Sequence, residues 1–158
     1  MEQFDFYDFF DEMNKHLDES VGHLYAIEYD DGIVKIGRTQ SPERRMYTLT
    51  KYRGKYHKII KVYISGIVQH SYYAEKKAMA GLEPVYGREC FNIPFSCAVK
   101  RVWAVTGGEP WFVANDWQSA RKRFPNIERP QEALERLFDE FLSVLKNGST
   151  QGSTFRIK

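Results

Sequence analysis

The sequence predicts an α+β domain with a mainly antiparallel sheet. Segments of helical periodicity and β-rich segments alternate along the chain, as expected for helices packed on a sheet. An Asp-Asp-Gly triplet at residues 30–32 separates two β-rich runs, which is the pattern of a tight hairpin turn. The 158-residue chain fits one domain with appendages, and its 28% of charged residues is usual for a globular protein.

The first half of the chain predicts a helix, a hairpin and a second helix. Residues 1–20 place aromatic and aliphatic residues at helical spacing, with acidic residues on the other face. The runs 24–29 and 33–37 are expected to form the two hairpin strands. Ser41 is the expected N-cap of a helix over 42–52, because a proline follows at the first helical position.

The next part of the chain predicts further strands and helices. Strands are expected over 56–64 and, more briefly, over 89–93, where aromatic residues precede a proline. Helices are expected over 71–82, where small and aliphatic residues recur at a spacing of four, and over 95–102.

A composition shift at TGGEP, residues 106–110, predicts a domain boundary. We expect a domain over 21–105, a helical extension over 106–147 and a flexible tail over 148–158. Helices over 116–124 and 130–146 make up the extension. The second carries an apolar stripe, which is expected to pack back on the domain, with a dimer contact as the alternative.

Composition excludes several classes of protein. No run of about 18 apolar residues is present, so a membrane-spanning helix is not expected. The acidic N-terminal segment is unlike a secretory signal peptide. Cys90 and Cys97 make neither a disulfide framework nor a zinc pattern. These observations predict a cytoplasmic protein in a reducing compartment, such as a bacterial or phage-infected cell.

Charge is distributed unevenly, although the formal net charge is only +2. Residues 1–20 hold seven acids and one lysine, whereas no acid occurs between Arg44 and Ala74. The acid-free span interleaves tyrosines with seven cations: Arg44, Arg45, Lys51, Arg53, Lys55, Lys58 and Lys61. Clustered cations and aromatics are typical of phosphate and base binding, although a solvated basic face over a tyrosine-containing core would look the same.

Glu75 is the first acid after this span, on an expected helix among tyrosines and lysines. A helical glutamate is usually a solvated partner of a lysine one turn away, but in a partly buried basic site it could hold a divalent cation. Lys35 and Tyr25 lie on the two expected hairpin strands, and Arg45 lies one turn into the following helix.

Five motifs in order resemble the GIY-YIG nuclease superfamily, most closely its phage and bacterial T5orf172-type branch. "HLYAI" takes the place of the GIY element and "VKIGRT" that of the YIG element, and "SPERRM" resembles the helix start of the branch. "HSYYAEKKAMAGL" resembles its glutamate helix, and "GRECFNI" resembles its Gly-x-Glu-aromatic segment. The resemblance covers about half of the chain and implies a small three-stranded antiparallel sheet flanked by helices.

The resemblance also implies a site. Its catalytic residues would be Tyr25, Lys35 in place of a tyrosine, Arg45 and Glu75, with His70 and Asn92 in secondary roles. Glu75 would hold a single Mg²⁺ or Mn²⁺ ion. The cations that would hold DNA nonspecifically are Arg44, Lys51, Arg53, Lys55, Lys58 and Lys61.

The implied activity is metal-dependent hydrolysis of phosphodiester bonds in DNA. Two alternatives share the same fold: a DNA-binding module that does not cleave, and a protein-interaction or inhibitory module. Lys35 separates these readings, because a lysine at the place of a tyrosine can stabilise phosphate charge but acts as a base only if its pKa is strongly depressed.

Overall fold

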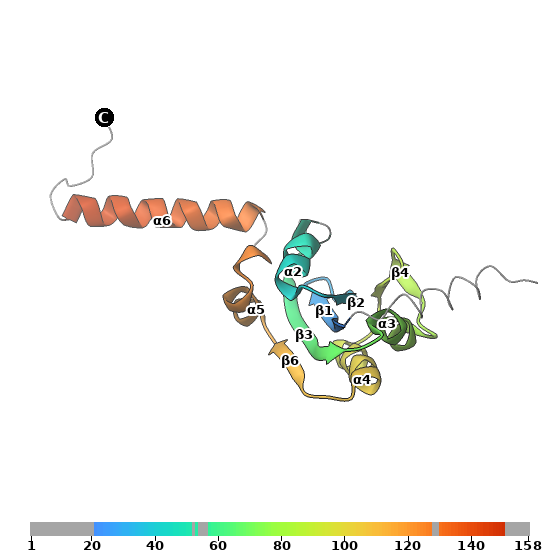
Figure 1. The fold of residues 1–158 in the computed structure, drawn as a ribbon. Helices are drawn as coiled ribbons and strands as arrows, with labels where there is room; N and C mark the ends of the chain where they lie inside the picture. The colour runs from blue at the N-terminus through green and yellow to red at the C-terminus, as the bar shows by residue number, and fades with distance from the viewer. Residues whose placement is uncertain (1–20, 52, 54–56, 128–129, 151–158) are drawn as a thin grey trace, which may run out of the picture.

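The protein is described by a computed structural model covering residues 21–51, 53, 57–127 and 130–150 (Figure 1). Its six strands form one antiparallel sheet in the order β4-β5-β2-β1-β3-β6. The strands are β1 (Gly22–Tyr29), β2 (Val34–Thr39), β3 (Ile59–Val68), β4 (Pro84–Tyr86), β5 (Cys90–Phe91) and β6 (Pro110–Ala114). The helices are α2 (Pro42–Lys51), α3 (Ser71–Met79), α4 (Phe95–Thr106), α5 (Trp117–Arg123), the 3₁₀ turn η2 (Pro125–Ile127) and α6 (Pro130–Thr150).

The expectation of a small three-stranded sheet is wrong. The α+β architecture is present, but β4, β5 and β6 extend the central β2-β1-β3 unit to six strands. The strand β5 lies within the short strand expected over 89–93, whereas β4 and β6 were not expected, because they are short and begin with prolines, which are usually taken as strand breakers. The strand β4 pairs with β5, β5 pairs with β2, and β6 pairs with β3.

The predicted hairpin is confirmed. Gly32 has a φ of +86°, which a residue with a side chain rarely adopts, and its N–H donates to the Tyr29 carbonyl at 2.9 Å. The turn brings β1 and β2 into an antiparallel ladder in which Tyr25 faces Gly37 and Ile27 faces Lys35. Side chains opposite each other project from the same face of a sheet, so this register decides which residues meet under α2.

The helix α2 begins where the sequence predicts. Its first turn closes by a hydrogen bond from the Arg45 N–H to the Ser41 carbonyl at 3.0 Å. Met46 and Leu49 are buried against the sheet, which leaves the neighbouring arginines at the surface of the helix or at its edge. The helix α2 therefore covers the face of the sheet that carries Tyr25, and Arg45 directly precedes the buried Met46 in this helix.

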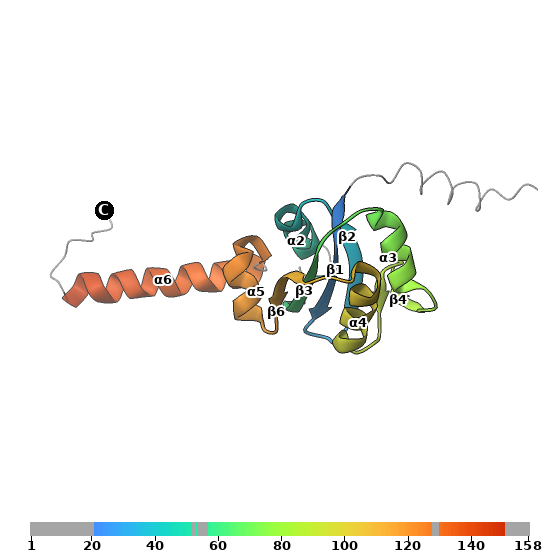
Figure 2. The same cartoon turned by 60° about the horizontal axis from the view of Figure 1, so that its bottom comes forward.

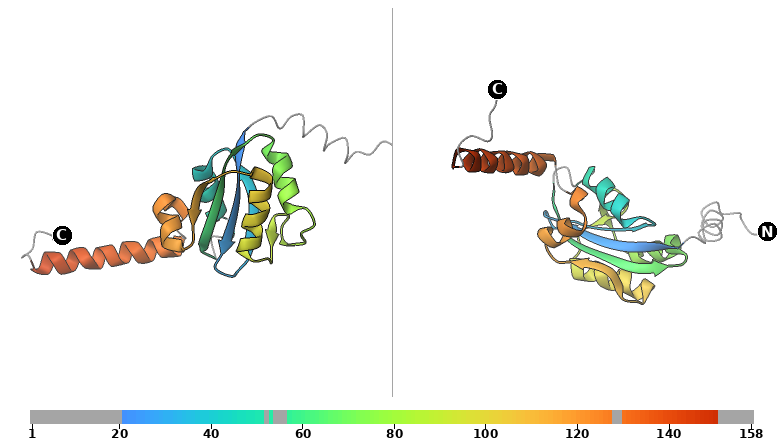
Figure 3. Two further views of the ribbon diagram at one scale, coloured as in Figure 1. Left: turned by 90° about the horizontal axis from the view of Figure 1, so that it is seen from below. Right: turned by 60° about the vertical axis from the view of Figure 1, so that its left-hand side comes forward.

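Helices cover both faces of the sheet, as the two views of Figure 3 show. One core lies between the sheet, α2 and α5; its large buried members include Tyr25, Ile27, Tyr29, Met46, Leu49, Ile64 and Phe124. The other lies under α3 and α4; it includes Leu24, Ala26, Ile36, Tyr63, Ala78, Phe91 and Val102. The alternation of β1 between these cores is the period-2 pattern of a strand buried on both faces.

Three boundaries differ from the sequence expectation. The strand β3 continues through Gly66 to Val68. Close to this glycine, its pairing with β1 and its pairing with β6 both shift register. The strand β6 pairs with β3, so the sheet crosses the boundary expected at residue 105. The helix α6 runs through Asn147 and Gly148 to Thr150. The helix and most of the tail expected over 1–20 and 148–158 lie outside the described residues.

The helix α6 projects away from the sheet beyond α5 and η2, as Figure 2 shows in a second view. One ion pair joins its first turn to the domain, with Lys58 Nζ 2.9 Å from Glu132 Oε1. Among the described helices, none combines the length and the apolar character needed to cross a bilayer.

Candidate functional site

The phenol of Tyr25 lies directly over Gly37 on the neighbouring strand. Tyr25 is fully buried, and a Cβ atom added to Gly37 would stand 2.2 Å from the phenol oxygen. Such a separation is impossible for nonbonded atoms, so only glycine leaves room for the ring here. Gly37 therefore fixes where the hydroxyl of Tyr25 lies.

Arg45 reaches that hydroxyl from α2. Its Nε donates a hydrogen bond to the Tyr25 oxygen at 3.0 Å, across 20 residues of chain. Among the described residues, this is the only hydrogen bond that the Arg45 side chain makes. The two terminal nitrogens of the guanidinium are thus placed to bind an anion in the adjoining cavity.

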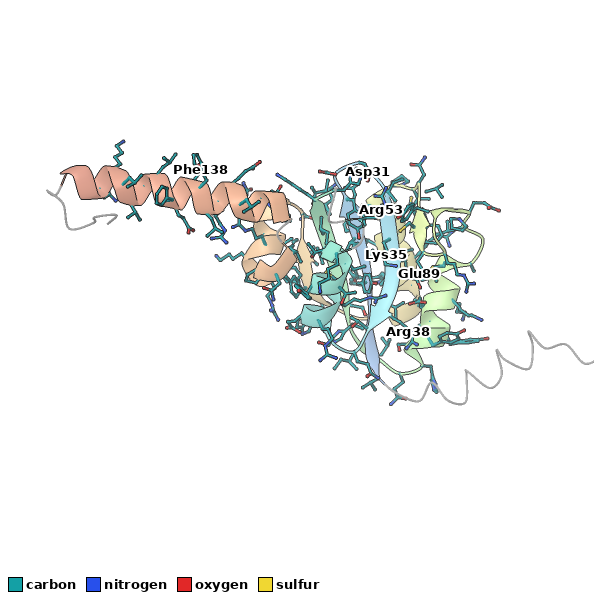
Figure 4. All side chains as sticks on the ribbon, turned by 90° about the horizontal axis from the view of Figure 1, so that it is seen from above. Asp31, Lys35, Arg38, Arg53, Glu89 and Phe138 are labelled. Carbon is teal, nitrogen blue, oxygen red and sulfur yellow. The ribbon has the colours of Figure 1, made fainter. Side chains whose placement is uncertain are left out.

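Lys35 forms an ion pair with Glu89, a residue without an assigned role in the sequence analysis. Both side chains are largely buried, with exposed fractions of 13% and 29%. The Glu89 backbone is also held, because its carbonyl accepts from the Ile36 N–H at 3.0 Å. Figure 4 shows Glu89 beside Lys35, with Arg38 farther along β2.

Glu75 presents a buried carboxyl group from α3. Only 8% of the residue is exposed. Burial raises its pKa to about 7, and the nearby charge of Glu89 adds to the rise, whereas Arg38, Lys35 and Arg45 oppose it. Near neutral pH this group therefore binds a proton readily, or would bind a cation that takes the place of the proton.

These groups converge on an open cavity of about 510 Å³ between α2, α3 and the end of β2. It is lined by Arg38, Thr39, Ser41, Arg44, Arg45, Thr48, Tyr72, Glu75 and Glu89. A second hollow of about 270 Å³ adjoins it and shares Arg45 and Glu89. Lys35 lines the second hollow and not the first, so Glu89 and Arg45 stand between Lys35 and the larger cavity.

The donor atoms of the larger cavity suit a hard divalent cation. The residues that line it include the acids Glu75 and Glu89 and the hydroxyl residues Thr39 and Ser41, and oxygen donors are what Mg²⁺ and Mn²⁺ prefer. The charge of Glu89 is shared with Lys35, which leaves Glu75 as the principal candidate ligand.

A different acidic group lies at the hairpin tip, where Asp30, Asp31 and His57 come together. Arg53 donates to both carboxylate oxygens of Asp31, at 3.0 and 2.7 Å, and His57 Nδ1 lies 2.9 Å from Asp30 Oδ1. These contacts join the β1–β2 turn to the segment after α2. The group is explained by this structural role.

The described cations that were expected to hold DNA make different contacts. Arg44 lines the larger cavity and Lys51 lies over the Tyr47 ring, with Nζ 4.6 Å from the centroid. The remaining described members make ion pairs, namely Arg53 with Asp31, Lys58 with Glu132 and Lys61 with Glu28. Lys55 lies outside the described residues. Arg38 and Tyr72, absent from the sequence prediction, take part in lining the cavity.

The two secondary candidates lie at exposed positions that do not line the larger cavity. His70 precedes α3 with a φ of 55°, and its carbonyl accepts from the Ala74 N–H at 3.0 Å. Asn92 follows β5. The left-handed backbone at His70 places α3 so that Ser71, Glu75 and Ala78 are buried.

A family model described as the T5orf172 domain matches residues 22–106, which is more than half of the chain. The chain belongs to the T5orf172 domain family. The T5orf172 domain occurs in GIY-YIG-like nuclease-associated proteins. Its matched range runs from the first residue of β1 to the last residue of α4 and contains every residue that lines the larger cavity. Neither the curated proteins nor the solved structures include a match to the chain.

The T5orf172 domain therefore contributes five of the six strands, and β6, α5, η2 and α6 follow it. The added strand completes the sheet beside β3, and Ala120 and Phe124 of α5 and its C-cap help to close the core under Tyr25. The segment after the T5orf172 domain thus supports the site by packing in the core that contains Tyr25.

Proposed function

We propose that the chain is a metal-dependent DNA endonuclease with a GIY-YIG-like site. The observation that supports this best is the hydrogen bond from Arg45 to Tyr25 beside the buried carboxyl group of Glu75. A guanidinium held at one nitrogen, next to a carboxyl group in a cationic cavity, is suited to a phosphodiester and a divalent cation. Membership in the T5orf172 family is consistent with this assignment.

Arg45 would bind the scissile phosphate. Its terminal nitrogens match two phosphate oxygens, and its Nε contact with Tyr25 fixes the plane of the guanidinium. Arg38 and Arg44 line the same cavity and would add positive charge around the DNA backbone. The Arg38 guanidinium lies 5.2 Å from the centroid of the Tyr72 ring, which limits its freedom before DNA arrives.

Tyr25 would orient groups in its protonated form. Burial raises the pKa of its phenol, although Arg45 opposes the rise, so the hydroxyl stays protonated at neutral pH. The oxygen accepts from Arg45, and because Tyr25 is fully buried and lines neither cavity, it would act on the site through the guanidinium that it orients.

Glu75 would hold Mg²⁺ or Mn²⁺, and such an ion stabilises the charge that develops on phosphate and leaving-group oxygens. Lys35 would act on the site through Glu89. The ammonium group balances the Glu89 carboxylate, which otherwise repels both the DNA backbone and the charged form of Glu75. A lysine in this position is therefore compatible with an active site, because it neutralises an acid that lines the same cavity.

A DNA-binding module that does not cleave is the second candidate. Its support is the position of Lys35, whose ammonium group is paired with Glu89 and does not line the larger cavity in which a phosphate would be bound. Incubation of the purified chain with supercoiled plasmid, in Mg²⁺ or Mn²⁺ and in EDTA, separates the two. Metal-dependent nicking supports the endonuclease, whereas salt-sensitive binding without nicking supports the second candidate.

A further inference from the structure

The helix α6 carries a large apolar surface that nothing in the described structure covers. Seven side chains of one stripe are exposed by 36–69%: Leu134, Leu137, Phe138, Phe141, Leu142, Val144 and Leu145. Phe138 projects from the helix well away from the sheet in Figure 4. Single exposed hydrophobic residues are normal, but a contiguous stripe of this size marks an interaction surface.

Within the described residues, the stripe does not pack extensively on its own domain. The described elements that pack together extensively are the strands, α2 to α5 and η2, and α6 is not among them. The Lys58–Glu132 ion pair holds the first turn of α6 to the domain while the stripe lies farther along the helix. The stripe is therefore available to another chain.

We propose that α6 pairs with α6 of a second copy of this chain in an antiparallel dimer. The stripe reads nearly the same in both directions about its centre, between Asp139 and Glu140. An antiparallel pair about that point sets Leu134 against Leu145, Leu137 against Leu142 and Phe138 against Phe141. A surface that is complementary to itself is what a two-fold interface requires.

The apolar area of the stripe is consistent with a second copy of α6 as its partner. The exposed fractions correspond to an apolar area on the order of 600 Å² per copy, close to the ~800 Å² per partner of a standard interface. The apolar positions recur at intervals of three and four, the spacing that interlocks in paired helices. Burial of two phenylalanines and four leucines per copy would supply the main driving force.

The charges beside the stripe favour the antiparallel orientation. Glu135 and Lys146 border the same side of the stripe near opposite ends of the helix. An antiparallel pair brings Glu135 of one copy near Lys146 of the other, whereas in a parallel pair this side of one stripe faces the opposite side of its partner. Because α6 projects from the domain, the antiparallel orientation would also place the two domains at opposite ends of the helix pair.

Sedimentation velocity of the full chain over a range of concentrations tests the proposal. The wild-type chain is expected to form dimers in the low-micromolar range. Phe138→Glu and Phe141→Glu are each expected to weaken the dimer at least about 30-fold. Ser143→Glu is the matched control, because residue 143 is exposed on the side of α6 opposite the stripe. A wild-type monomer, or a dimer that both Phe variants leave intact, would overturn the proposal.

Disulfide cross-linking tests the orientation in a Cys97→Ser background, which removes the exposed native thiol and leaves the buried Cys90. Leu134→Cys and Leu145→Cys chains are oxidised separately and as a mixture. The antiparallel pair predicts a cross-linked dimer only in the mixture, because equal positions lie about 16 Å apart along the axis. Cross-linking of each variant with itself would indicate a parallel pair and contradict the proposal, as would the absence of any cross-link.

Discussion

Tyr25 and Gly37 face each other across β1 and β2, and the ring of Tyr25 occupies the volume that a side chain at residue 37 would need. The sheet register thereby fixes the phenol hydroxyl to which Arg45 binds. One glycine on a strand thus controls the position of an arginine on a helix.

Gly37→Ala should therefore disturb the site more than a methyl group normally would. The new Cβ must displace the Tyr25 ring from a close-packed core, at a cost of about 1–3 kcal/mol in the free energy of unfolding. Urea unfolding measures the cost. Gly66→Ala is the matched control on β3, because its Cβ would meet nothing closer than a carbonyl oxygen at 3.4 Å. Equal effects of the two substitutions would contradict the proposed role of Gly37.

Lys35 and Glu89 should show energetic coupling. Removal of either partner, by Lys35→Met or Glu89→Gln, leaves the other charge largely buried and unbalanced. Each single variant should lose stability, and the double variant should lose less than the sum, with a coupling of about 1 kcal/mol. A double-mutant cycle by urea unfolding gives the value. Additive losses would mean that the ion pair does not hold in solution.

Arg44 and Arg53 should separate DNA binding from stability, although they lie close together in the basic span. Arg53→Ala removes two hydrogen bonds to Asp31, which should cost about 1–3 kcal/mol of stability and leave DNA affinity nearly unchanged. Arg44→Ala should cost little stability, weaken DNA binding and reduce the salt slope of the affinity by about 1. Fluorescence anisotropy at several salt concentrations checks the affinities, and the reverse pattern would contradict these roles.

Glu75 should make the metal-free protein less stable as the pH rises. The carboxyl pKa is about 7 in the folded state against 4.5 ordinarily, so the folded state holds the proton more tightly. The stabilisation is full below pH 4.5 and is lost as the pH rises through 7, by about 3 kcal/mol at most. Urea unfolding in EDTA between pH 5 and 8 should show this loss in the wild type and a smaller one in Glu75→Gln. Parallel curves would refute the pKa assignment.

Local patterns predicted the centre of the fold. The Asp-Asp-Gly turn and the alternating runs on either side of it predict β1 and β2, and a proline after a serine predicts the start of α2. The strands β4 and β6 escaped because both begin with prolines, and β6 also pairs with β3, which lies far earlier in the sequence. A strand of three residues has no periodicity from which it could be recognised.

The site was predicted in part for the same reason. Tyr25, Arg45 and Glu75 stand in motifs that the sequence displays, and the structure brings Arg45 and Glu75 to one cavity above Tyr25. Glu89 was missed as a functional residue because its partner Lys35 lies 54 residues earlier, and a local sequence pattern does not predict a contact over that separation. The pairing of Arg53 with Asp31 was likewise hidden, so Arg53 was assigned to DNA.

The endonuclease proposal is tested most directly by metal-dependent nicking of supercoiled plasmid. The assay compares the wild type with Glu75→Ala, Arg45→Ala and Glu83→Ala. Glu83 is an exposed acid between α3 and β4, so Glu83→Ala controls for the loss of a carboxylate. We expect nicking by the wild type and Glu83→Ala, a rate at least about 100-fold lower for Arg45→Ala, and none detectable for Glu75→Ala. A Glu75→Ala protein that nicks the plasmid at the wild-type rate would contradict the account.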